Sequence, residues 1–367
     1  MFALLTNTPR DYAWGSRAAI AELLGRPASG GPEAELWLGT HPGSPARLVD
    51  GGATLLETLD APLPYLLKVL AAAEPLSLQA HPTPEQAAEG FAREEAAGVP
   101  LDAPQRNYKD RGAKPELIYA LSDPFRALSG FRPVADTLAV LDPVRDDPRI
   151  APLVGRLGGD GALRAVVRWL LERGEGVEEL VAAVVEAAAV VEGPSWETVR
   201  LLAGRYPGDP GIAISLLLHT VALRPGEALY LPAGNIHAYL EGLGIELMAA
   251  SDNVLRGGLT PKHVDLPELL RVLDVRPLPV PYLVPEEREP GVRVFRPEGV
   301  GFALTVVDAA ALARGVELPA PGRSLALAVG GAVEIGADEV PAGSAAYLSG
   351  ESPLAVRGRG TLFLASA

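Results

Sequence analysis

The chain has 367 residues, of which 48% are hydrophobic and 21% charged, with a net charge of −14 and no cysteine. This length can bury a large core and suffices for two or three domains. The negative charge argues against nucleic acid or an anionic membrane as a partner, and the lack of cysteine restricts any metal site to nitrogen and oxygen ligands.

Membrane insertion and secretion are not indicated. No apolar run approaches the ~18–20 residues that a transmembrane helix needs. The N-terminal residues lack the basic region and long apolar core of a secretion signal. We therefore expect a cytoplasmic protein.

Residues 1–121 show short strand-like runs broken by turns rich in Gly, Pro and Asp. In the run SLQAHP, Ser77, Gln79 and His81 alternate with Leu78 and Ala80. A strand would place the three polar side chains on one face. Such a face suits a polar cavity, but taken alone it is more simply a half-buried strand whose polar face meets water.

One clear helix is expected directly after this run. Thr83 is its predicted N-cap, Pro84 occupies the first helical position, and Gln86 completes a capping box. The apolar period then becomes helical from about residue 123 to residue 209, in RAVVRWLLERG and VEELVAAVVEAAAVVEG. Ser195 is predicted to cap a further helix there.

Strand-like patterns return after the PGDPG turn and continue to the C-terminus. The predicted fold is therefore mainly β with a helical insertion, in which two β units are joined to an all-α insert. The expected division is a metal-binding β unit from residues 1–122 and 212–285, a helical insertion at 123–211, and a second, metal-free β unit at 286–367.

An internal sequence repeat supports two related β units. In GEALYLPAGNIHAYL, a Pro-Ala-Gly turn is followed by His237. The string VPAGSAAYL near the C-terminus repeats the PAG turn but has Ala346 at the position of the histidine. The first string resembles the second signature of cupins, which are jelly-roll barrels with a metal in the barrel mouth. It departs from that signature at Glu241, where cupins have Asn. The second copy is predicted to be metal-free.

Lysine is the rarest basic residue of the chain, and all of its copies fall in three blocks of the sequence. The blocks are LPYLLKVLAAAEPLSLQAHP, NYKDRGAKPELIYAL, and LPAGNIHAY onward to SDNVLRGGLTPKH. Because lysine and arginine differ in hydration, geometry and pKa behaviour, a retained lysine suggests a specific chemical need.

These blocks, together with DYAWGS and AELWLGTHP, occur in order over about the first 265 residues, and the chain resembles the type I mannose-6-phosphate isomerases. The resemblance implies two cupin-type jelly-roll units with a helical insertion, and aldose–ketose isomerisation of mannose 6-phosphate and fructose 6-phosphate through a cis-enediolate. It places the metal ligands on Gln79, His81, Glu116 and His237. One departure is Ala113, where the family often has a histidine before KPE.

This ligand set suits one Zn²⁺ per chain, with Fe²⁺, Co²⁺ or Mn²⁺ as possible substitutes. Isomerisation also needs a general acid or base that reaches the two reacting carbons. Glu246 and Lys114 are candidates, although a solvated edge carboxylate and a surface lysine are the simpler interpretations. Arg256 is the third catalytic candidate, and it would hold the phosphate or a developing enediolate oxygen.

The remaining candidates would contact substrate. Lys68 lies in an apolar run, where a buried lysine needs a partner or a function. Lys262 and Arg256 flank a Gly-Gly turn that can hold an anion. The other predicted substrate-binding residues are Ser77, Trp14, His41 and Asp252. His41 is equally explained as a turn histidine, and Asp252 as part of the turn before Arg256. His219 and His263 are assigned to packing or surface.

Two rival classes remain at this point. An oxygen-using cupin enzyme would favour iron and histidine-rich ligation, which fits the Gln ligand poorly. A silent sugar-binding cupin would not need lysines in these blocks. The expected partner is a small sugar phosphate, with no nucleic acid and no membrane, and the chain is expected to be a monomer or weak homodimer.

Overall fold

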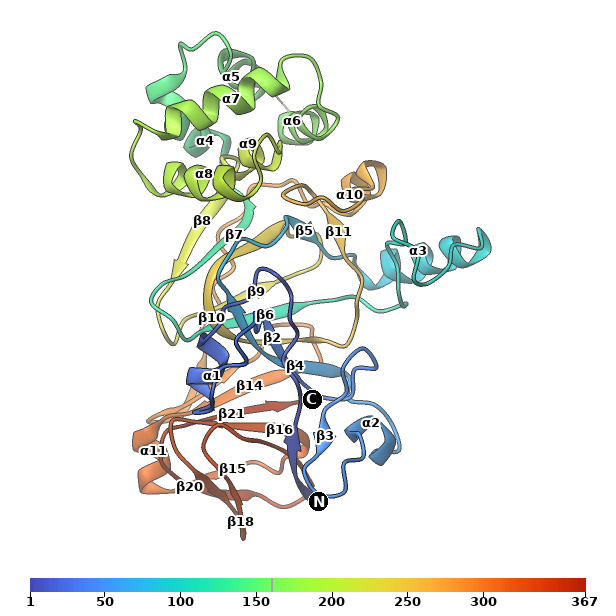
Figure 1. The fold of residues 1–367 in the computed structure, drawn as a ribbon, viewed down its shortest axis with the longest axis vertical. Coiled ribbons are helices and arrows are strands. Elements are labelled where there is room, and N and C mark those ends of the chain that lie inside the picture. The colour runs from blue at the N-terminus through green and yellow to red at the C-terminus, as the bar shows by residue number, and fades with distance from the viewer. Residues whose placement is uncertain (160) are drawn as a thin grey trace.

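The computed structural model describes residues 1–159 and 161–367. Its β units are stacked along the long axis of the molecule, and most helices gather at one end (Figure 1). Within the described residues, none of the helices has the length and apolar character required to cross a membrane. The mainly β fold with helical additions agrees with the sequence prediction.

One sheet carries six of the thirteen predicted site residues, including three of the four predicted metal ligands. Its strands are β2 (Glu35–Leu38), β4 (Tyr65–Ala72), β5 (Gln79–Ala80), β6 (Glu116–Ala120), β7 (Phe125–Phe131), β8 (Leu218–Leu223), β9 (Ala228–Leu231), β10 (His237–Ala249) and β11 (Leu255–Arg256).

The long strand β10 organises this sheet by changing partners along its length. Its first residues pair with β5 and β7, and its later residues pair with β4 and β6. The register shifts between Tyr239 and Glu241, and Gly242 follows with a φ of +132°. A Cβ at Gly242 would lie 2.7 Å from the Phe125 ring, so only glycine fits at this change of partner.

The C-terminal β unit contains a larger and a smaller sheet. The larger sheet has the order β12 (Glu286–Glu289), β13 (Val292–Phe295), β14 (Ala303–Val307), β21 (Thr361–Ser366), β16 (Gly322–Val329), β19 (Ala345–Gly350), β1 (Phe2–Thr6) and β3 (Arg47–Leu48). The smaller has the order β15 (Val316–Leu318), β20 (Leu354–Gly358), β17 (Val333–Ile335) and β18 (Asp338–Val340).

Apolar faces hold the two units together. Leu67 and Val69 of β4 and Leu247 of β10 lie in one buried cluster with Leu304 and Phe363 of the C-terminal sheet. Side chains alternate along a strand, so the intervening residues of β4 and β10 point to the opposite face. The packing of the two units therefore directs one face of β4, β6 and β10 towards the site.

The helices are short and mostly belong to the insertion, whose apolar faces cover the upper edge of the sheet. They are α1 (Ala19–Leu23), α2 (Leu55–Thr58), α3 (Pro84–Ala96), α4 (Val134–Leu141), α5 (Ala151–Arg156), α6 (Ala162–Leu171), α7 (Val177–Ala188), α8 (Pro194–Arg205), α9 (Gly211–Ser215), α10 (Leu266–Val272) and α11 (Ala309–Arg314), with a 3-10 turn at Asp142–Val144.

The helix predicted after SLQAHP is confirmed as α3. Thr83 accepts a hydrogen bond from the Gln86 backbone, and the Gln86 side chain accepts one from the Thr83 backbone. The predicted cap at Ser195 is wrong, because α8 starts one residue earlier at Pro194 and its N-cap is Gly193. Proline is favoured at the first helical position, so it moves the start of the helix and leaves Ser195 inside it.

Two segments differ from the division expected from sequence. Residues 125–131, inside the range assigned to the helical insertion, form the strand β7 and pair with β8 and β10. Residues 2–6, assigned to the metal-binding unit, form β1 and pair with β19 in the C-terminal sheet. The helices of the insertion begin only at Val134.

Candidate active site

A row of paired residues crosses four strands at the upper part of the sheet. Arg256 of β11 pairs with Gln79 of β5, Gln79 pairs with His237 of β10, and His237 pairs with Ser129 of β7. Directly paired residues point to the same face, with their Cβ atoms about 4.5–5.5 Å apart. The row therefore brings Arg256 and Gln79 beside His237, although they are far apart in sequence.

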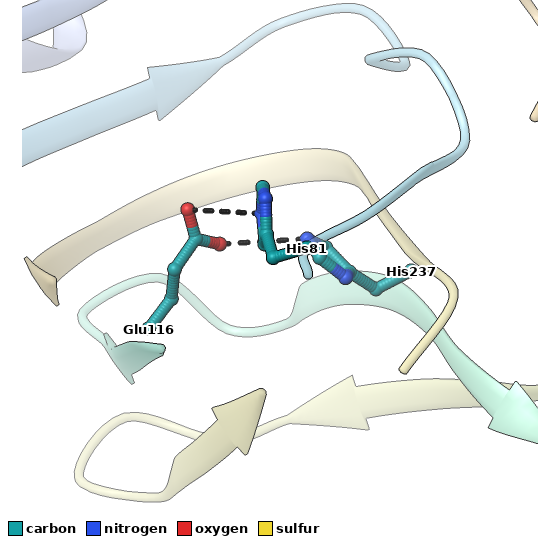
Figure 2. Close-up of side chains that lie close together, drawn as sticks. All are labelled: His81, Glu116 and His237. Atoms are coloured by element: carbon teal, nitrogen blue, oxygen red, sulfur yellow. Dashed lines mark ion pairs between the residues drawn. The ribbon is translucent and has the colours of Figure 1, made fainter. Parts of the chain in front are cut away.

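His81, Glu116 and His237 form a buried group at this face (Figure 2). His81 Nε2 lies 3.3 Å from one Glu116 carboxylate oxygen, and His237 Nε2 lies 3.4 Å from the other. One ligand atom from each residue falls within 4.8 Å of the other two. Leu78 and Ala80 point away into the apolar core, as the alternation in SLQAHP predicted.

The atoms of this group fit a bound cation. His81 Nε2, His237 Nε2 and Glu116 Oε2 are buried and have no hydrogen-bond partner among the described residues. Leaving buried polar atoms unpaired costs about 1–3 kcal/mol each. Two imidazole nitrogens and a carboxylate are ligands that divalent zinc accepts, so a metal ion would satisfy all three.

The backbone sets the tautomer of both histidines. His81 Nδ1 lies 2.7 Å from the carbonyl oxygen of Asn253, and His237 Nδ1 lies 3.0 Å from that of Asn235. A carbonyl oxygen only accepts, so each Nδ1 carries the proton and donates. Each Nε2 is therefore left with a free lone pair directed at Glu116.

The protonation states of His81 and Glu116 also suit metal binding. Burial lowers the pKa of His81 to about 4, so its imidazole is neutral near pH 7. Burial would raise the pKa of Glu116, but Lys114 and the histidines outweigh that effect and hold it well below its usual value. A neutral imidazole and an ionised carboxylate are the forms that bind metal ions.

Two lysines lie next to the metal group. Lys114 Nζ is 2.8 Å from Glu116 Oε1, and Lys68 Nζ is 2.9 Å from Glu246 Oε2 and 3.6 Å from Glu35 Oε1. Both lysines are buried, at 8% and 5% exposure. Lys114 is therefore not a surface lysine. Glu246 is also buried, so it is not a solvated carboxylate at a sheet edge.

Burial and charge act in opposite directions in the Lys68 cluster. Burial alone would lower the pKa of Lys68, but Glu246 and Glu35 outweigh it and raise that pKa. Burial and nearby carboxylates raise the pKa of Glu246, against the effect of Lys68. Lys68 therefore stays charged, and the carboxyl group of Glu246 keeps a proton to higher pH than an exposed glutamate would.

Sequence reasoning missed two side chains of this cluster. Glu35 accepts a hydrogen bond from the Trp37 indole at 2.8 Å as well as facing Lys68. Tyr239 is buried, its hydroxyl lacks a hydrogen-bond partner among the described residues, and its ring centroid lies 6.2 Å from that of His237. The alternation of His237 and Tyr239 along one strand is a signal that could have identified the tyrosine.

His41 and Asp252 lie together at the rim of the site. His41 Nε2 is 3.2 Å from Asp252 Oδ2, and the His41 ring packs edge-on against Trp37 with centroids 4.9 Å apart. His41 is buried, whereas half of the Asp252 side chain is exposed. Burial would raise the pKa of Asp252, but His41 outweighs it and lowers that pKa.

The remaining candidates are Trp14, Ser77 and Lys262. Trp14 is half-buried, stacks on Tyr12, and packs against the apolar interior of the site-bearing unit. Ser77 is half-buried but precedes β5, which covers only Gln79 and Ala80. Lys262 is exposed.

The departure noted at Ala113 lies at the edge of the site. Ala113 is half-buried and directly precedes Lys114. Its methyl side chain offers no proton-transfer group, so the acid and base must come from other residues.

Comparison with known proteins agrees with this geometry. A family model described as the catalytic domain of type I phosphomannose isomerase matches residues 1–134. The mannose-6-phosphate isomerase of Escherichia coli K12 is 36% identical over 384 aligned residues, covering 98% of this chain and 97% of the relative. The human enzyme of that name is 34% identical and covers 74% of this chain and 73% of its own length.

The chain belongs to the mannose-6-phosphate isomerase family.

Solved structures of mannose-6-phosphate isomerases have the same fold. A zinc-bound mannose 6-phosphate isomerase superposes with a TM-score of 0.89 at 34% identity, over 100% of this chain and 99% of that one. A variant of the phosphomannose isomerase from Salmonella typhimurium superposes with a TM-score of 0.90, with the same identity and coverage. The resemblance seen in the sequence blocks thus extends over the whole chain.

Proposed function

We propose that the protein is a zinc-dependent isomerase that interconverts mannose 6-phosphate and fructose 6-phosphate through a cis-enediolate. The observation that supports this most strongly is the buried group of His81, Glu116 and His237, whose ligand atoms lack other partners. It stands beside two buried lysines and a half-buried arginine in a member of this enzyme family.

Gln79 is the proposed fourth ligand. It pairs directly with His237, so its amide lies on the same face of the sheet. When bound, zinc would act as a Lewis acid that stabilises negative charge on the substrate oxygens at C1 and C2.

Arg256 and Lys262 are proposed to hold the anionic substrate. Burial lowers the pKa of Arg256, and burial together with repulsion from Arg256 lowers that of Lys262. In the described part of the chain, no carboxylate forms an ion pair with either of them. Two cations close enough to repel each other, in a protein of net charge −14, form a local site for a dianionic phosphate.

Proton transfer between the two carbons is assigned to the buried cluster. Glu246 has a raised pKa and could accept and return a proton. Lys114 and Lys68, held by Glu116 and Glu246, would neutralise charge on the substrate oxygens. Ser77, Trp14, His41 and Asp252 are proposed to line the sugar.

The proposal is tested with zinc-loaded protein and mannose 6-phosphate, with fructose 6-phosphate measured as product. His237→Ala should abolish both tight zinc binding and isomerisation while circular dichroism shows the fold retained. His219→Ala is the matched control, because His219 is a strand histidine outside the metal group, hydrogen-bonded to the Leu278 carbonyl. Full activity after exhaustive chelation, or in His237→Ala, would contradict the proposal.

The same assay distinguishes the rival classes. An oxygen-using enzyme would form no fructose 6-phosphate but would consume oxygen with another substrate, and a silent binding protein would do neither. We also propose that the protein is cytoplasmic and is a monomer or weak homodimer, which sedimentation velocity over a range of concentrations would test.

A further inference from the structure

Asn253 lies between the segment that carries His81 and the segment that leads into Glu116. It is fully buried at 0% exposure, in the loop between β10 and β11. It is one of four asparagines in the whole chain. Its backbone and its side chain contact two different segments that carry metal ligands.

The backbone of Asn253 orients the first of these segments. Its carbonyl oxygen accepts the hydrogen bond from His81 Nδ1 at 2.7 Å. This contact fixes the rotation of the imidazole and directs Nε2 towards Glu116. Such partners of a ligand histidine tune metal affinity without touching the metal.

The side chain of Asn253 binds the segment that leads into Glu116. Its Oδ1 accepts from the backbone N–H of Lys109 at 2.7 Å and of Asp110 at 3.3 Å. Its Nδ2 donates to the carbonyls of Asp110 at 2.9 Å and Gly112 at 2.8 Å, and to Asp110 Oδ1 at 3.3 Å. Lys114 and Glu116 follow within four residues of Gly112.

We propose that Asn253 is a positioning residue that sets the distance between His81 and Glu116. The amide holds the 109–112 segment against the same backbone whose carbonyl holds His81. Only an amide of this length supplies both the acceptor and the donors that these backbone groups require. This proposal goes beyond the proposed function but rests on its metal site.

Two other asparagines provide comparisons. Asn235 offers its backbone carbonyl to His237 in the same way, but its side chain makes one hydrogen bond, accepted from Ser129 at 3.3 Å. Asn7 lies outside the metal group, and its side chain makes the same number of hydrogen bonds as that of Asn253. Its partners are Trp37, Ser44 and Thr8.

The experiment measures zinc affinity by competition with a chromogenic chelator, together with thermal unfolding of the zinc-free protein. Asn253→Ala should weaken zinc binding about 10- to 100-fold. Asn7→Ala loses as many side-chain hydrogen bonds at a half-buried position, so it should lower the unfolding temperature while changing zinc affinity less than about threefold. The zinc affinity of Asn235→Ala should lie between that of wild type and that of Asn253→Ala.

Asn253→Ser keeps a shorter polar side chain and provides a second variant if Asn253→Ala does not fold. It should also bind zinc more weakly than Asn7→Ala. Zinc affinity equal to wild type in either Asn253 variant, or an equal loss in Asn7→Ala, would overturn the proposal. Wild-type protein that binds no zinc would instead refute the proposed function itself.

Discussion

Arg256 illustrates how the site is assembled from single residues. It lies at the end of the row formed with Gln79 and His237, which gives it a fixed position relative to those two residues. Its neighbour Gly258 has a φ of +114°, and a Cβ there would lie 3.1 Å from Asp209 Oδ1. The glycine turn therefore holds the chain close while Arg256 faces the site.

Arg256→Lys should retain the charge but lose the planar fork that makes two parallel hydrogen bonds. We expect kcat/KM to fall by about 2–4 kcal/mol, roughly 30- to 1,000-fold, with kcat carrying more of the loss than KM. Steady-state kinetics with mannose 6-phosphate would measure both. A variant with near-normal kcat/KM would show that Arg256 serves only the turn.

Individual site residues differed in how far the sequence could identify them. The proposed metal ligands followed from the family resemblance of the blocks SLQAHP, KPEL and GNIHAY, which contain them. Glu35 and Asn253 act through contacts with segments distant in sequence. Such contacts depend on strand pairing, which one sequence without structure does not specify.

At the scale of elements, the boundaries of helices and strands follow local signals where these do not compete. The capping box of α3 was predicted correctly, since Thr83, Pro84 and Gln86 all favour the same start. In α8 the proline and the serine favoured different starts, and the proline prevailed. The strand β7 was missed because its apolar residues directly precede the helical pattern.

Thr83→Ala removes the N-cap of α3, two residues after His81. The loss should lower the free energy of unfolding by about 0.5–2 kcal/mol. Thr83→Ser keeps the hydroxyl acceptor and should retain most of the stability. Urea denaturation of the three proteins would measure this, and equal stability of Thr83→Ala and wild type would contradict the role of the cap.

The turn after α1 is predicted to stabilise the protein in a pH-dependent way. Glu33 is 2% exposed and accepts hydrogen bonds from the Arg26 guanidinium and the Ser29 backbone. Arg26 is the main cause of the lowered pKa of Glu33, with burial acting against it. This stabilisation is present above the unfolded pKa near 4.5 and is lost as the pH falls through the lower folded value.

Glu33→Gln should therefore reduce the free energy of unfolding by about 1.5–3 kcal/mol at pH 7. The difference from wild type should shrink as the pH falls below 4.5, where the carboxyl of the unfolded chain becomes protonated, and should be lost below the lower pKa of the folded protein. Urea denaturation at pH 7 and at a pH below the folded pKa would measure this difference in the free energy of unfolding. Glu22 is exposed, so Glu22→Gln serves as the control. A difference that does not depend on pH would show that the ion pair is not responsible.

At the scale of the whole molecule, the two β units share a turn but differ in a residue that follows it. Gly234 and Gly343 occupy equivalent PAG turns with φ of +79° and +74°. The residue three positions on is His237 in one unit and Ala346 in the other. Ala346 is fully buried in the apolar core of the C-terminal unit, where it pairs with Leu4 and Ala326.

We therefore expect one zinc per chain, measured by elemental analysis of zinc-loaded protein. Ala346→His should not raise this number, because the new imidazole would lack further ligands in an apolar core. It should instead lower the stability by about 1–3 kcal/mol through overpacking. Two metal ions per wild-type chain would disprove the metal-free C-terminal unit.

The strand β1 has a consequence for the order of events during translation. It is synthesised long before β19, yet it pairs with β19, and the backbone of Met1 bonds to that of Ser349 in both directions. The nascent chain must therefore leave the edge of β1 that faces β19 unpaired until β19 has been synthesised, although the other edge can pair with β3 much earlier. Domains usually fold from the N-terminus as they emerge, but here the larger C-terminal sheet can include β1 only after β19 has been synthesised.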